Sequence, residues 1–233
     1  MKNKVLIFGG TSGIGYSIYD LLKKNNNCIT VSRKKNNRKN HVMLDLSRPE
    51  EAIKILKKLF KIKIKYYFIF SQRYRGEELE NHINITIISA IKILSFFEKK
   101  FVKNSSVVFI LSQARKKILN NHDIGYHVSH AAIANIIKFY AVKLGHAGVR
   151  VNGIATATIK KNTNRKYFSK KNNLTNLLKK LSPLKLIGDS KDVANCVEFL
   201  ISPKSGYITG QVIPVDGGVD LVSNENLAKK ITS

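Results

Sequence analysis

The chain has 233 residues, of which 43% are hydrophobic and 24% are charged. This composition excludes a disordered or fibrous chain, and the length predicts a single domain over residues 1–233. Two cysteines argue against a disulfide scaffold, and every long apolar run is interrupted by polar residues, which argues against a membrane span. We therefore expect a cytoplasmic protein with no membrane partner.

The net charge is +26, from 41 basic and 15 acidic residues. A general surplus of lysine accounts for much of it, and no nucleic-acid-binding motif is visible, so we do not expect nucleic acid as a partner. One asymmetry remains. No acidic residue lies between Asp123 and Asp189, whereas twelve basic residues do. A positive field of this extent favours an anionic partner.

Hydrophobic patterning predicts strands that alternate with helices. Residues 5–8 form a short apolar run typical of a buried parallel strand, and a glycine-rich turn at 9–15 leads into a helix. Further strands are predicted at 28–31, 42–44, 67–70, 107–111, 150–155 and 211–215, and helices at 50–60, 77–100, 126–145 and 193–201. This order predicts an α/β fold: a doubly wound, Rossmann-type parallel sheet of about seven strands with helices on both faces.

A basic segment at about 158–187 is the one long stretch for which we predict neither a strand nor a helix. It follows the sixth predicted strand, at the edge where open α/β sheets bind their ligands. Long loops of this kind are usually functional or disordered. We expect a mobile substrate lid here, and a solvated insertion is the alternative.

The glycine turn predicts a nucleotide site. Gly9 permits a sharp turn after the first strand, and Gly13 and Gly15 permit the close approach of a dinucleotide and of the neighbouring strand. The N-terminus of the following helix would face the pyrophosphate. At the end of the second predicted strand, where an acidic residue would select NAD, the chain has Ser32 and Arg33 followed by two lysines. This favours NADP(H) over NAD(H).

Several segments match one family's motifs along the whole chain. Residues 8–15 match TGxxxGIG except at the first position, and residues 126–132 are similar to YxxSKAA. Further matches are Leu44-Asp45-Leu46, Ile83-Asn84-Ile85, residues 150–154 (RVNxI), residues 207–211 and Val215-Asp216-Gly217-Gly218. Together they resemble the short-chain dehydrogenase/reductase family, in the single-domain branch that includes 3-oxoacyl-carrier-protein reductases.

The resemblance implies hydride transfer between nicotinamide C4 and a carbonyl or alcohol carbon, with Tyr126 as general acid/base. It implies Ser112 as the donor to the substrate oxygen. Ser112 lies fourteen residues before Tyr126, one more than is usual in the family, so Gln113 is the alternative donor. Asn84 would kink its helix and hold a proton-relay water, or would simply be a polar residue on a helix face. The implied cofactor contacts are Gly9, Thr11, Ser12, Gly13, Ile14, Gly15, Ser32, Arg33, Asp45, Leu46, Ser71 and Ile159.

Three departures from the family pattern affect the expected chemistry. The NNAG segment is replaced by residues 70–73 (Phe-Ser-Gln-Arg), and the threonine that usually meets the cofactor diphosphate is Lys161. The lysine of YxxxK, which carries a charge beside the tyrosine, is His130. An imidazole is largely neutral above pH 7.5, so we expect weak activity unless a cation such as Arg73 or Arg115 compensates.

The histidines at 122, 127 and 130 raise the question of a metal site, but no cysteine and no carboxylate beyond Asp123 accompanies them, and none is expected. We expect an NADP-dependent enzyme that acts on an anionic substrate: a nucleotide sugar, a carboxylated metabolite or an acyl chain on an acidic carrier protein. The alternative is a catalytically impaired member that serves as a dinucleotide-binding or regulatory module. The family likeness also implies a homo-oligomer, either a tetramer or a dimer.

Overall fold

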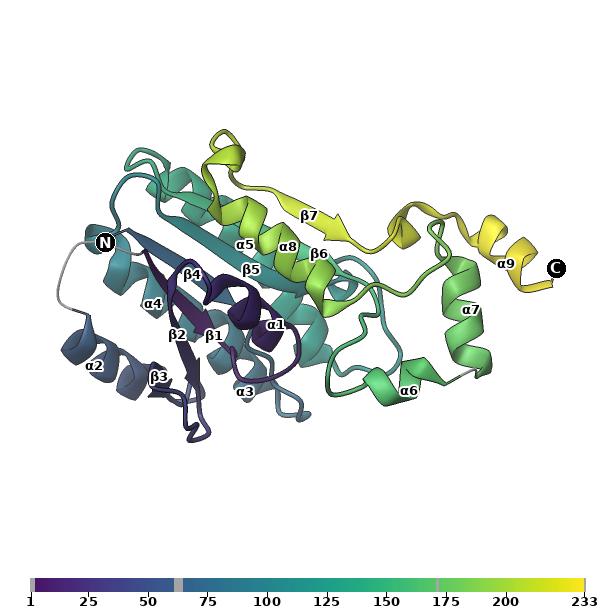
Figure 1. The fold of residues 1–233 in the computed structure, drawn as a ribbon, viewed down its shortest axis with the longest axis horizontal. Helices are drawn as coiled ribbons and strands as arrows, with labels where there is room; N and C mark the ends of the chain where they lie inside the picture. Colours follow the sequence, from purple (N-terminus) through teal and green to yellow (C-terminus); the bar gives the residue numbers. More distant parts are fainter. Residues whose placement is uncertain (1–2, 61–64, 171, 233) are drawn as a thin grey trace.

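Seven parallel strands form one sheet in the order β3-β2-β1-β4-β5-β6-β7 (Figure 1). The computed structural model describes residues 3–60, 65–170 and 172–232. The strands are β1 (Lys4–Phe8), β2 (Asn27–Ser32), β3 (His41–Met43), β4 (Tyr66–Phe70), β5 (Ser106–Ser112), β6 (Arg150–Thr156) and β7 (Val212–Val215). The predicted doubly wound sheet is confirmed, and each predicted strand is correct to within one residue at either end.

The strand order reverses beside β1, which pairs with β2 on one side and with β4 on the other. Ligands of open α/β sheets bind at such a reversal, outside the carboxyl ends of the strands. Phe8, Phe70 and Phe109 occupy paired positions on β1, β4 and β5 just before those ends. Their rings stack in sequence, with centroid separations of 4.7 Å and 4.6 Å. This buried row holds the three strands in register directly beneath the reversal.

Helices cover both faces of the sheet and divide the core into two clusters. On one face, α1 (Gly13–Leu22) lies beside α8 (Ser190–Ile201), as Figure 1 shows. On the other face lie α2 (Pro49–Leu59), α4 (Ser89–Phe97) and α5 (Ile124–Gly145). Among the helices of the described residues, none is long and apolar enough to cross a membrane.

The helix predicted over 77–100 is present but is not uniformly α-helical. It consists of α3 (Leu79–His82), a π-helical segment η1 (Ile83–Ile88), α4, and a 3₁₀ turn η2 (Glu98–Lys100). The Ser89 N–H donates to the Asn84 carbonyl oxygen five residues earlier, which is the π-helical pattern. π-Helical turns often occur at functional sites, and this one packs against α5.

The prediction of an irregular segment at 158–187 is wrong. The segment contains α6 (Arg165–Ser169) and α7 (Asn173–Leu181), while residue 171 lies outside the described residues. Leucines at 174, 177, 178 and 181 repeat at helical spacing, and the surrounding lysines obscured this pattern. The Asn172 Oδ1 accepts a hydrogen bond from the Thr175 N–H at 2.8 Å and so caps α7. Figure 1 shows α6, α7 and the C-terminal α9 (Asn224–Thr232) extending beyond the end of the sheet.

Candidate active site

The three glycines of the turn after β1 have different structural roles. A Cβ on Gly9, whose φ is +80°, would lie 2.7 Å from the Ser71 carbonyl oxygen, and one on Gly15 would lie 2.3 Å from the Gly9 carbonyl oxygen. These two glycines let backbone segments pack directly against each other. A Cβ on Gly13 would have a single close neighbour, the Lys161 Cδ at 3.7 Å. Gly13 therefore leaves open space at the start of α1.

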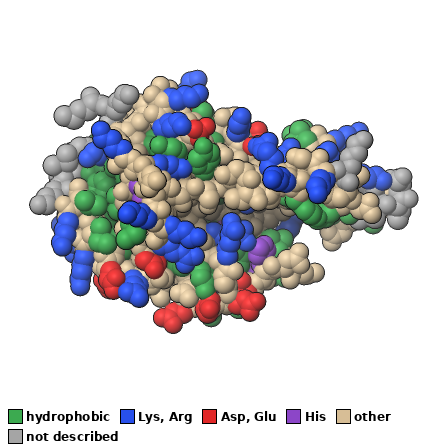
Figure 2. Space-filling model, turned by 60° about the horizontal axis from the view of Figure 1, so that its bottom comes forward, with side chains coloured by type: hydrophobic (Ala, Val, Ile, Leu, Met, Phe, Trp, Pro, Cys, Tyr) green, Lys and Arg blue, Asp and Glu red, His purple; other side chains and the backbone are tan. Residues whose placement is uncertain are grey.

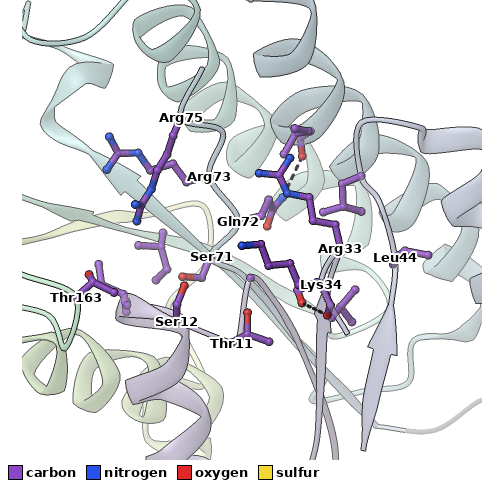
Figure 3. Close-up of a pocket in the computed structure, with 18 of the residues that line it drawn as sticks. Thr11, Ser12, Arg33, Lys34, Leu44, Ser71, Gln72, Arg73, Arg75 and Thr163 are labelled. Carbon is purple, nitrogen blue, oxygen red and sulfur yellow. Dashed lines mark hydrogen bonds between the residues drawn. The ribbon is translucent and has the colours of Figure 1, made fainter. Parts of the chain in front are cut away.

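A cavity of about 690 Å³ lies over the carboxyl ends of β1, β2 and β4 (Figure 3). Of the twelve residues predicted to contact the cofactor, ten line it: Gly9, Thr11, Ser12, Gly13, Ile14, Ser32, Arg33, Asp45, Leu46 and Ser71. Gly15 does not line the cavity because it packs under the turn. Ile159 is only 3% exposed and belongs to the core cluster beneath α1 and α8.

The cavity fits a dinucleotide at its central part. The free space at Gly13 lies at the N-terminus of α1, where backbone N–H groups and the positive end of the helix dipole attract a diphosphate. The Gly13 N–H donates to the Asn162 Oδ1 at 3.2 Å, so a ligand oxygen bound there takes the position of that amide oxygen. The Gln72 Oε1, on a residue that lines the same cavity, is buried without a hydrogen-bond partner.

Basic residues surround the end of the cavity beside β2. The Ser32 hydroxyl donates to the Lys34 carbonyl oxygen at 3.2 Å and so shapes the turn that carries Arg33, and both Arg33 and Lys34 line the cavity (Figure 3). Arg38 was not predicted. Its guanidinium donates to the Gly10 carbonyl oxygen at 3.0 Å and lies 4.2 Å from the centroid of the Tyr19 ring. It therefore ties the loop after β2 to the glycine turn.

Tyr126 lies where this cavity meets a second one of about 860 Å³, because it lines both. The Asp123 Oδ1 accepts a hydrogen bond from the Tyr126 N–H at 2.9 Å, which caps α5 and places the tyrosine in its first turn. The His122 ring stacks on the tyrosine ring at 4.1 Å, and the His130 ring meets it edge-on at 4.3 Å. The Arg73 Cζ lies 4.9 Å from the ring centroid. The tyrosine is thus enclosed by two imidazoles and one guanidinium.

His130 is held as a neutral ring. Its Nδ1 accepts a hydrogen bond from the Ser112 N–H at 3.3 Å, so the proton of the neutral ring is on Nε2. Burial first, and the positive charge of Arg73 second, lower the pKa of His130 to about 3. His130 therefore carries no charge at neutral pH and does not replace the family lysine electrostatically.

The structure brings Ser112, His130 and Tyr126 together. The Ser112 N–H donates to the His130 ring, and the His130 ring contacts the Tyr126 ring. The Ser112 Oγ, on a residue that is 8% exposed, accepts a hydrogen bond from the Ala114 N–H at 3.2 Å. The Gln113 side-chain amide instead donates to the Asp216 Oδ2 at 3.3 Å. Asn84 is half-buried in the π-helical segment and lines neither cavity.

Three cations line the wall that the two cavities share: Arg73, Arg75 and Lys161. Burial lowers the pKa of Lys161, and the charges of the two arginines lower it further. Arg115, the other cation proposed from the sequence to assist Tyr126, lines neither cavity and acts with Lys117 to lower the pKa of Asp220. Of the two, only Arg73 lies beside the tyrosine.

Two further histidines near Tyr126, His127 and His82, form hydrogen bonds within the protein. The His127 Nε2 accepts from the Leu119 N–H at 2.8 Å, and its Nδ1 lies 2.8 Å from the Asp123 carbonyl oxygen. The buried His82 has its Nε2 3.1 Å from the Asp123 Oδ1 and was missed in the sequence, although the absence of a side chain on Gly125 permits its approach. Within the described part of the chain, no group of three or more His, Cys, Asp or Glu residues is placed to hold a metal ion.

Comparison with known proteins identifies the family. Residues 71–220 match the family model described as enoyl-(acyl carrier protein) reductase. The chain belongs to the short-chain dehydrogenase/reductase family.

A curated relative, the 3-oxoacyl-[acyl-carrier-protein] reductase FabG of Buchnera aphidicola subsp. Baizongia pistaciae, is 24% identical over 241 residues, covering 94% of this chain and 97% of the relative. Other curated relatives align over 141 to 151 residues, and the chain spans only 52 to 58% of their length.

Solved structures share the fold. A 4-hydroxyisoleucine dehydrogenase complexed with NADH is 24% identical, with a TM-score of 0.82, over 95% of this chain and all of that chain. ElxO with NADP bound is 22% identical, with a TM-score of 0.77 and the same coverage.

The neutral state of His130 predicts an acid-sensitive contribution to stability. In the unfolded chain a histidine titrates near 6.5, so below that pH the unfolded state binds one proton that the folded state excludes. The contribution is complete above about pH 6.5 and is lost as the pH falls from there toward 3, by about 1.4 kcal/mol per pH unit. Urea unfolding at several pH values between about 7 and 5 measures this slope.

His130→Asn should make the free energy of unfolding depend less steeply on pH in that interval. The matched control is His146→Asn, since His146 is exposed. Equal slopes in the wild type and in His130→Asn would contradict the burial of a neutral imidazole.

Proposed function

We propose that the protein is an NADP(H)-dependent oxidoreductase that transfers a hydride between the nicotinamide and a carbonyl or alcohol carbon of an anionic substrate. The observation that carries the proposal is the position of Tyr126, at the junction between a cavity that fits a dinucleotide and a second cavity open to a substrate. Family membership supports the same reaction type. When bound, the cofactor supplies or accepts the hydride at nicotinamide C4.

In this proposal, residues of the chain hold the diphosphate and the 2′-phosphate of the cofactor. Thr11, Ser12 and the N-terminus of α1 hold the diphosphate, and Lys161 neutralises part of its charge from across Gly13. Arg33 and Lys34 bind the 2′-phosphate at the end of β2. The same end lacks an acidic residue on β2 that would bind the ribose hydroxyls of NAD and repel this phosphate.

In the reducing direction, the Tyr126 hydroxyl donates its proton to the substrate oxygen as the hydride arrives at carbon, and in the oxidising direction it removes that proton. The Ser112 hydroxyl donates a hydrogen bond to the same oxygen. Because the Ser112 Oγ accepts a bond from the Ala114 N–H, its own proton is left to donate. We favour Ser112 over Gln113 for this role, since the Gln113 amide is engaged by Asp216.

The family resemblance implies that the lysine of YxxxK has two tasks, since it donates a hydrogen bond to the nicotinamide ribose and places a charge beside the tyrosine. In this proposal, His130 and Arg73 divide these two tasks. The guanidinium of Arg73, close to the ring of Tyr126, stabilises the negative charge that develops on the tyrosine oxygen. The Nε2–H of the neutral His130 remains available to donate to a ribose hydroxyl of the cofactor. This division favours an enzyme over a dinucleotide-binding module without catalytic activity.

We also propose that the protein is a homo-oligomer. The long helix α5 exposes Ile124, Val128, Phe139 and Val142, with exposures of 65%, 42%, 62% and 83%. Large apolar side chains gathered on one helix favour a protein interface.

Tyr126→Phe tests the reaction. Loss of the hydroxyl should reduce kcat by about 100-fold or more, the usual contribution of a positioned acid/base group, while the dissociation constant for NADPH stays the same. Stopped-flow or steady-state NADPH oxidation with a panel of carbonyl substrates, together with NADPH titration by fluorescence, measures both quantities. Tyr207→Phe is the matched control because Tyr207 is fully exposed. Full activity in Tyr126→Phe would refute this mechanism.

Arg33→Asp tests the cofactor preference. Its carboxylate should repel the 2′-phosphate, so NADPH binding should weaken by about 10- to 100-fold while NADH binding changes little. Isothermal titration with each cofactor gives the two dissociation constants, and Arg48→Asp, which lines neither cavity, serves as the control. Equal losses for NADPH and NADH would remove Arg33 from this role.

A further inference from the structure

The shared wall of the two cavities brings together three positive charges from distant parts of the chain. Arg73 and Arg75 follow β4, and Lys161 follows β6. Figure 3 shows the two arginines extending together on the side of the cavity that also carries Thr163, with Arg33 and Lys34 on the opposite side. In the part of the chain that the structure describes, no carboxylate lies within ion-pair distance of any of the three.

This arrangement is unfavourable for the protein alone. Lys161 loses hydration through burial, and both arginines repel it, which is why its pKa is lowered. Arg73 and Arg75 are themselves exposed to the cavities and are not neutralised by neighbours. An anion placed between these side chains would relieve the repulsion.

The three cations do not all serve the cofactor. Lys161 lies across the open space at Gly13 and therefore belongs with the diphosphate. Arg73 and Arg75 also line the second cavity, in which Tyr126, His122 and Asn121 are further lining residues. Because the tyrosine marks the reacting carbon of the substrate, an anion held by the two arginines is part of the substrate.

Two carboxylates in the second cavity do not cancel this charge. The Asp123 Oδ1 lies 3.1 Å from the His82 Nε2 and accepts a hydrogen bond from the Tyr126 N–H, and in the described part of the chain this carboxylate forms no ion pair with an arginine. Glu77 is exposed, and among the ion pairs of the described residues none joins it to either arginine. Of the lysines in the basic segment, Lys161 lines both cavities, whereas Lys166, Lys170, Lys179 and Lys180 line neither. Figure 2 shows a hollow in this face of the molecule, and many Lys and Arg side chains lie around it.

We propose that Arg75 and Arg73 form an anion subsite and that the substrate carries a phosphoryl group, which they hold while its carbonyl or alcohol carbon lies beside Tyr126. A phosphoryl group fits better than a carboxylate, because two guanidinium groups present more donors and more charge than one carboxylate can accept. Thr163, at the edge of both cavities, adds a hydroxyl donor. This inference rests on the proposed function, since the substrate's position is defined by Tyr126.

The test uses inorganic phosphate as the probe and the full-length protein saturated with NADP⁺, so that the cofactor covers the glycine turn. Thermal-shift and calorimetric titrations at constant ionic strength compare the wild type, Arg75→Gln, Arg75→Lys and the control Arg48→Gln. We expect saturable binding to the wild type and to Arg48→Gln. Phosphate binding should weaken at least about tenfold in Arg75→Gln. It should weaken less in Arg75→Lys, because lysine keeps the positive charge but lacks the paired N–H donors of the guanidinium.

Three results would overturn the inference: no saturable phosphate binding, equal binding to the wild type and Arg75→Gln, or tighter binding of acetate than of phosphate. Unfolding of each variant without phosphate shows whether it folds, and Arg75 is exposed, so we expect no loss of stability. A failure of the proposed function is distinguishable, because it would appear as the absence of any response to NADP⁺ or NADPH, whatever phosphate does.

Discussion

The hydrogen bond from the Ser112 N–H to the His130 Nδ1 determines how Ser112, His130 and Tyr126 are arranged. It joins the end of β5 to the second turn of α5, and so sets the position of Tyr126 one turn earlier on the same helix. The bond requires an unprotonated Nδ1, and burial keeps the ring neutral. The position that supplies a positive charge in the family motif therefore supplies a fixed, uncharged ring in this protein. A cation has to come from another segment, and Arg73 is the one that the fold places beside the tyrosine.

The sheet brings these segments together through close packing at the carboxyl ends of β1 and β4. Stacked phenylalanines hold β1, β4 and β5 in register, and Gly9 lets the turn after β1 lie against Ser71 without intervening side chains. The residues that follow β4 are then directed over the reversal of strand order. Arg73 is the last of the four residues that stand where the family has NNAG, and Arg75 lies two residues further on. The two departures from the family motifs are thus connected: the helix α5 loses a charge beside Tyr126 at His130, and the segment after β4 provides one at Arg73.

The sheet and its helices were predictable from sequence because buried parallel strands are short apolar runs and each is bounded by a clear turn. The glycine turn and the position of Tyr126 followed from motifs with fixed spacing. The helix α7 was not predicted, since its leucine repeat is embedded among lysines and we interpreted the segment by its charge alone. The neutral state of His130 depends on burial and on a backbone donor eighteen residues away, which no local pattern reveals. Arg75 and Lys161 line the same cavities but lie on segments far apart in the sequence, so no local pattern predicts that they come together.

In the proposed reaction, the positive charge of Arg73 stabilises the negative charge that develops on the Tyr126 oxygen when the substrate carbonyl is reduced. The sharpest test compares kcat for carbonyl reduction at one neutral pH in the wild type, Arg73→Lys and Arg73→Gln. Loss of the charge in Arg73→Gln should lower kcat by about tenfold or more, whereas Arg73→Lys should stay near the wild type. Equal kcat values in all three proteins would contradict this role of Arg73.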